Sequence, residues 1–192
     1  MRSLRFPCLV IAALLPDTAF AHEAFGNLGP FYTHMLHPAV DPSQGVLLVG
    51  MGALLARQPV ETVRSAYALF AMASALAAVI LTVLPLTAPG VRLTAATAVL
   101  LGIMTAIGLQ LPRWFVAVLC VGVAIIAALS FDAAPSTKSI QTAAGGALGL
   151  ALTVLIVWGA LDWAGERLHP VAAAVAGSWI AAVGLMVMAL PA

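Results

Sequence analysis

Six apolar stretches, separated by short polar breaks, dominate the pattern along the chain. They cover residues 44–56, 65–84, 93–111, 114–131, 140–161 and 171–190. The breaks hold most of the prolines and nearly all the charged side chains. A helix of roughly 20 apolar residues crosses a bilayer, and five of the six stretches are close to that length. The pattern therefore predicts an all-α polytopic membrane bundle of about six transmembrane helices.

The first stretch is shorter than the others, and two prolines, Pro38 and Pro42, precede it. Each proline lacks an N–H and disfavours helix at the residue before it. We therefore expect a kinked segment over 29–57, with a short helix or turn, a kink and then a membrane helix. The alternative is an extracellular loop followed by a short, tilted helix. Broken backbone at membrane depth occurs where it is buried in protein or lines a cavity.

The N-terminal residues 1–21 have the pattern of a cleaved secretory signal peptide. Two arginines precede an apolar stretch over 6–15, which is too short to span a hydrocarbon core about 30 Å thick, and small residues lead up to Ala21. An uncleaved anchor is the alternative. Cleavage after Ala21 makes His22 the mature N-terminus, whose α-amine and imidazole together can chelate a late transition metal. Residues 22–192 then form one six-helix transmembrane domain.

The charged residues at the breaks indicate an orientation. A cleaved signal places the mature N-terminus outside the membrane. Six spans then place four arginines inside (Arg57, Arg64, Arg113, Arg167) and two basic residues outside (Arg92, Lys138). This distribution agrees with the positive-inside rule. We therefore expect a bacterial inner (plasma) membrane protein with a periplasmic N-terminus.

Composition supports the bilayer as the main partner. The chain is 63% hydrophobic and 8% charged, against about 25% charged residues in soluble domains. Its formal net charge of +1 suggests no nucleic-acid partner. The sequence has no phosphate-binding loop, CxxC pair or arguable Ser/His/Asp set, so we expect that the protein is not an enzyme. The alternative is an intramembrane enzyme.

The histidines supply the candidate chemistry. His34 and His37 are three residues apart, so a helix would place both on one face, and Asp41 follows four residues later. Together with His22 they form a candidate site for a divalent transition metal such as Ni, Co, Cu or Zn. The alternative is that histidines at a membrane interface cap helix ends or bond main-chain carbonyls. His169 is expected on the opposite side of the membrane.

Two further patterns concern packing and turns. Gly145 and Gly149 have the small-xxx-small spacing that lets two helices approach closely. We expect this seam to lie within the chain, and a dimer seam is the alternative. Arg57, Gln58 and Glu61 are expected in a solvated cytoplasmic turn. The sequence does not indicate an oligomeric state.

Several stretches of the chain resemble a known family. The predicted cleavage before His22, the stretch "FYTHMLHP", the glycine-containing first helix and the closing "GSWIAAVGLMVMAL" are similar to the HupE/UreJ family. The resemblance implies a small bacterial membrane protein, encoded with hydrogenase or urease genes in many cases. Such proteins are regarded as nickel or cobalt permeases or as accessory proteins.

The family's hallmark is a histidine followed, after five residues, by Asp-His. His37 matches the first histidine, whereas Ser43 and Gln44 stand where Asp and His are expected. The chain is closer to a divergent branch with prolines at the positions of Pro38 and Pro42. The leading hypothesis is therefore a transition-metal binding protein or permease that captures its ion at His22, His34, His37 and Asp41. The alternative is a non-transporting accessory protein that docks a periplasmic metalloenzyme or its assembly factors.

Overall fold

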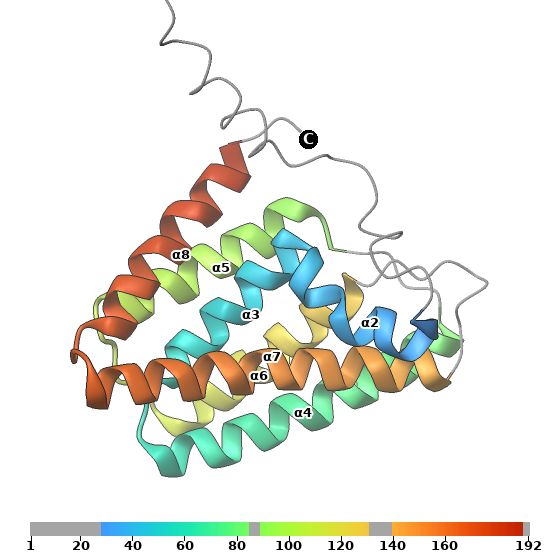
Figure 1. Cartoon of the computed structure of the whole chain (residues 1–192), viewed down its shortest axis with the longest axis horizontal. Helices are drawn as coiled ribbons and strands as arrows, with labels where there is room; N and C mark the ends of the chain where they lie inside the picture. Colours follow the sequence, from blue (N-terminus) through green and yellow to red (C-terminus); the bar gives the residue numbers. More distant parts are fainter. Residues whose placement is uncertain (1–27, 85–88, 131–139, 190–192) are drawn as a thin grey trace, which may run out of the picture.

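The computed structural model describes residues 28–84, 89–130 and 140–189, and these residues form seven helices and no strand. The helices are α2 (Gly29–Val40), α3 (Pro42–Leu55), α4 (Val60–Val83), α5 (Val91–Ala106), α6 (Arg113–Leu129), α7 (Ile140–Arg167) and α8 (Ala172–Ala189) (Figure 1). The all-α prediction is confirmed. The predicted signal peptide and His22 lie outside the described residues.

The lengths and surfaces of the helices suit a membrane. Helices α4, α7 and α8, with 24, 28 and 18 residues, are each long and apolar enough to cross one, whereas α3, α5 and α6 are apolar but shorter. Large apolar side chains cover the outside: Leu76, Ile156 and Met186 are 62%, 66% and 67% exposed. An apolar exterior of this kind matches lipid better than water. These are features of a helical membrane protein.

Helix α5 ends at Ala106, earlier than the predicted end at 111. Gly108 follows with a φ of 68°, a conformation that glycine adopts without steric cost. The chain then turns back, and the amide of Leu109 donates to the carbonyl of Met104 over 3.0 Å. Helix α7 departs from the prediction in the other direction, because it continues past 161 to Arg167.

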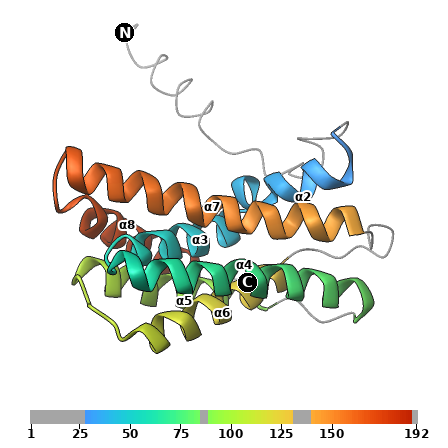
Figure 2. The ribbon, with the colours of Figure 1, turned by 90° about the horizontal axis from the view of Figure 1, so that it is seen from below.

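Helix α3 forms the centre of the bundle. It packs against α2, α5, α6, α7 and α8, and its large side chains are fully buried (Leu47, Leu48, Met51, Leu54, Leu55). Figure 2 shows α2 and α7 on one side of it and α4, α5 and α6 on the other. A helix that is apolar on every face is expected to be enclosed in this way. The core of the molecule is therefore built around α3, which at 14 residues is the shortest of the apolar helices α3 to α8.

Glycines allow two close helix contacts. In α5 and α8, Gly102 and Gly177 face each other, and a Cβ on either would lie 2.7 Å from main-chain atoms of the opposite helix. In α7, a Cβ on Gly145 or Gly149 would collide with the main chain of α2, at Phe31 and Met35 respectively. The small-xxx-small spacing in α7 therefore serves packing within the chain, as expected.

Helices α2 and α3 together run alongside α7. The contacts follow the same order along both segments: Phe31 lies at Gly145, Met35 at Gly149, and Gly52 at Val157. At 1.5 Å per residue, the 28 residues of α7 extend about 42 Å. An interrupted helix thus lies beside an uninterrupted one. Helix α2 consequently lies beside the first half of α7.

Candidate functional site

The chain breaks its helix at Asp41. Pro42 disfavours helix at this position, and Asp41 is extended, with φ −89° and ψ 106°. One carboxylate oxygen, Oδ1, accepts hydrogen bonds from the Ser43 amide at 2.9 Å, the Ser43 hydroxyl at 2.8 Å and the Gln44 amide at 3.4 Å. This arrangement caps the start of α3. The expected kink is therefore present, and it has one origin, because Pro38 lies within α2.

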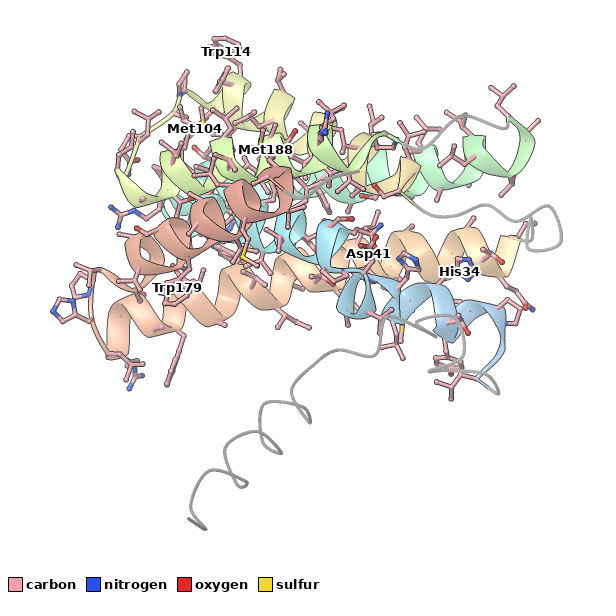
Figure 3. The ribbon with its side chains drawn as sticks, turned by 90° about the horizontal axis from the view of Figure 1, so that it is seen from above. His34, Asp41, Met104, Trp114, Trp179 and Met188 are labelled. Carbon is pink, nitrogen blue, oxygen red and sulfur yellow. The ribbon has the colours of Figure 1, made fainter. Side chains whose placement is uncertain are left out.

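The candidate ligands follow one face of α2. His34 and His37 are one turn apart, and the amide of Asp41 donates to the carbonyl of His37 at 2.9 Å, so the helical spacing extends to Asp41. Figure 3 shows His34 and Asp41 on the same side of this segment. The Nδ1 atom of His34 lies 2.9 Å from the carbonyl oxygen of Pro30. The face therefore offers two imidazoles and one carboxylate in a row.

Gln44 joins three helices at the break. Its side chain is fully buried, and its Nε2 donates to the carbonyl of Ala127, in α6, at 2.7 Å. Its Oε1 lies 3.1 Å from Nδ1 of His37. Because Oε1 can only accept, Nδ1 of His37 donates this hydrogen bond. The imidazole is thus oriented by an amide that is itself held by α6.

A groove of about 570 Å³ opens beside the break. Its lining comes from α2, Asp41 and α3 (Pro38, Ala39, Asp41, Pro42, Gly45, Val46, Val49), α7 (Thr153) and α8 (Trp179, Ile180, Val183). The polar side chains among them are those of Asp41 and Thr153. Thr153 and Ile180 each lie near the middle of their helices. The break therefore lies midway along the bundle.

The described residues contain no group of three His, Cys, Asp or Glu side chains that could hold a metal ion. His22, the fourth predicted ligand, lies outside them. His34 and His37 each bond a protein oxygen, and Oδ1 of Asp41 caps α3.

Some residues of the site could not be identified from the sequence. Gln44 stood out there only as a departure from the family pattern, although a lone amide at the start of an apolar stretch is a signal for a buried hydrogen bond. Thr153 and Trp179 have no local signal, because they reach the groove only through the packing of α7 and α8 on α3.

At the opposite end of the bundle, the structure differs from one expectation. Gln58 was expected in a solvated turn, but it is 9% exposed. Its Nε2 donates to the carbonyl of Leu109 at 3.0 Å, and its Oε1 accepts from the amide of Leu111 at 3.1 Å. This amide therefore fixes the turn between α5 and α6 against the end of α3. His169 is exposed at the turn between α7 and α8.

Comparison with known proteins identifies no relative of the chain. No protein-family model matches the chain, and searches of curated proteins and of solved structures return no match either.

Proposed function

We propose that the chain is a bacterial inner-membrane protein that binds a divalent transition metal, nickel or cobalt in the first place, from the periplasmic side. The observation that carries the proposal is the row formed by His34, His37 and Asp41, which leads along α2 to a helix break midway along the bundle. Interrupted helices form the ion sites of many transporters. The resemblance to the HupE/UreJ family points to the same class of ion.

Six spans fit this proposal. Each of α3, α5 and α6 is shorter than the roughly 20 residues that cross a bilayer, but α2 extends the first span beside α7. Three of the four arginines that were expected inside lie at the turns joining α3 to α4, α5 to α6 and α7 to α8 (Arg57, Arg113, Arg167), and Arg64 is in the second turn of α4. The positive-inside rule then makes this end cytoplasmic and places α2 toward the periplasm.

The ligands proposed are His22, His34, His37 and Asp41. Imidazole nitrogen suits Ni, Co, Cu and Zn, and His34 and His37 place two imidazoles one turn apart on α2. Gln44 stands where the family pattern has histidine, and its amide oxygen contacts the imidazole of His37. Position 44 therefore faces His37 across the break. We infer that Gln44 orients the imidazole as an outer partner of the ligand.

Metal analysis of the purified protein tests this proposal. After equilibration with nickel and washing, the wild type is expected to retain about one ion per chain, and His37→Ala is expected to lower the affinity by at least about tenfold. His169→Ala is the matched control, because it removes an exposed histidine at the other end. The proposal fails if nickel, cobalt, copper and zinc all wash off the wild type. It also fails if His37→Ala binds nickel as tightly as the wild type.

The second candidate is an accessory protein that binds metal or a periplasmic assembly factor without transport. One observation favours it: α3, which continues the path inward from the break, has no ionisable side chain. Buried ions normally find charged partners along a transport path. Uptake of radioactive nickel into proteoliposomes separates the two, because an accessory protein retains metal but gives no uptake above empty vesicles.

A further inference from the structure

We propose that the break between α2 and α3 binds a monovalent cation, sodium, through the carboxylate of Asp41 and the main-chain carbonyls of Pro38 and Ala39. The inference goes beyond the transition-metal function and does not depend on it.

The first argument is the hydrogen bonding of the main chain at the break. In a helix, each carbonyl accepts from the N–H four residues later. The carbonyl of Pro38 would need the N–H of Pro42, which does not exist. The carbonyls of Ala39 and Val40 would need the next two N–H groups, and both of these turn to Oδ1 of Asp41. Within the described residues, none of the three carbonyls receives a hydrogen bond.

The second argument is the location of the residues at the break. Pro38, Ala39 and Asp41 line the groove of about 570 Å³, whose other walls are almost entirely apolar. Gly45 leaves room for one of them, since a Cβ there would lie 2.9 Å from the carbonyl oxygen of Pro38. A main-chain carbonyl without a donor costs several kcal/mol at membrane depth, so these oxygens need a positively charged or donating partner.

The third argument is the balance of charge, which selects the class of cation. The partial negative charge at the C-terminal end of α2 and the partial positive charge at the start of α3 offset each other, so the charge at the break is that of the Asp41 carboxylate. A monovalent cation neutralises that carboxylate with the surrounding oxygens alone, whereas a transition-metal ion takes the imidazole of His37 as well. Carbonyl and carboxylate oxygens are ligands for hard cations. The ends of interrupted helices bind sodium in this way in several transporters.

Equilibrium binding of radioactive sodium to the purified protein in detergent tests the inference. The buffer contains a chelator that removes transition metals and choline as the replacement cation. The wild type is expected to bind about one sodium ion, and Asp41→Asn is expected to weaken binding by about tenfold or more, because asparagine keeps the cap of α3 but has no charge. Asp162→Asn is the control, because it removes an exposed carboxylate at the other end of the bundle.

A second variant tests the carbonyls and keeps the carboxylate. Pro42→Ala supplies the N–H that the carbonyl of Pro38 lacks, so sodium affinity is expected to fall several-fold while the protein stays folded. Sodium binding by the wild type no greater than a detergent blank overturns the inference and means that water occupies the break. Unchanged affinity in Asp41→Asn or in Pro42→Ala overturns it as well.

His37→Ala separates this inference from the proposed function. It removes an imidazole and leaves the oxygens, so it is expected to lose nickel and to keep sodium. A wild type that binds sodium but no transition metal would refute the proposed function alone. The reverse result would refute the sodium site alone.

Discussion

Gln44 links more of the structure than any other single side chain at the break. It is fully buried at the start of an otherwise apolar helix, and it bonds a histidine in α2 and a carbonyl in α6 that is 83 residues away in sequence. A buried amide is favourable only when its donors and acceptors are paired. Gln44 therefore fixes the position of α2 and of α6 relative to α3.

Gln44→Leu is expected to destabilise the protein by about 1–3 kcal/mol, because it removes one buried and one partly buried hydrogen bond and leaves His37 without this partner. The measurement is thermal or denaturant unfolding in detergent. Gln110→Leu is the control, because that amide is exposed and its one bond is to the carbonyl of Arg57. An equal loss in both variants would contradict the role given to Gln44.

Asp41 can be tested for its structural role separately from its charge. Asp41→Ala removes the cap of α3 and is expected to cost about 1 kcal/mol of stability, whereas Asp41→Asn is expected to stay within a few tenths of the wild type. Unfolding of the three proteins side by side decides this. If the asparagine variant is as unstable as the alanine variant, the cap is not what stabilises the break.

At the scale of elements, the position of α2 depends on α7. Two glycines of α7 lie directly against the main chain of α2, and no side chain in between could yield. The absence of a Cβ allows the helices to approach closely, so the helix that carries His34 and His37 is held against α7. Other glycines of α7 face open space, and these provide matched controls.

Gly149→Ala is expected to destabilise the protein by about 1–3 kcal/mol, because the added methyl group forces α2 away from α7. Gly159→Ala, on the same helix with no atom within 4 Å of the new Cβ, is expected to be neutral or to stabilise by up to about 1 kcal/mol. Unfolding in detergent gives both values. Similar effects at the two positions would rule out the seam as the cause.

The contrast between α2 and α4 shows how far the sequence predicts these elements. The apolar stretch of α4 is long enough to predict a helix by itself, and the structure confirms it. The residues of α2 include two prolines, two histidines and a threonine, and only packing on α7 makes them a full helix. The sequence predicted that His34 and His37 share a helix face and that Asp41, four residues later, belongs to the same site. It could not predict that Gln44 reaches α6 or that Thr153 lines the groove, since both depend on tertiary contacts.

At the scale of the whole molecule, the two ends of the bundle differ in chemistry. One end has α2 with its histidines, and the other has the turns with Arg57, Arg113 and Arg167. The proposed topology makes the first end periplasmic and the second cytoplasmic. The difference can be measured without any knowledge of the ligand.

Single cysteines placed at Tyr32, in α2, and at Glu166, near the end of α7, are expected to react on opposite sides of the membrane. Both positions are exposed, and a background of Cys8→Ser and Cys120→Ala removes the native thiols. A membrane-impermeant maleimide should label Tyr32→Cys in intact spheroplasts, and Glu166→Cys only after permeabilisation. Labelling of both from the same side would refute the six-span topology.

The late position of α7 and α8 in the chain has a consequence for biogenesis. On the proposed topology, the walls that shield the break are synthesised long after Asp41 enters the membrane; they are Thr153 from α7 and Trp179 with its neighbours from α8. Until they arrive, the Asp41 carboxylate and the three carbonyls that receive no hydrogen bond from the described residues would face lipid or the insertion machinery. The protein environment of the first span is therefore completed last. We expect nascent chains that stop before α7 to be recognised by membrane proteases.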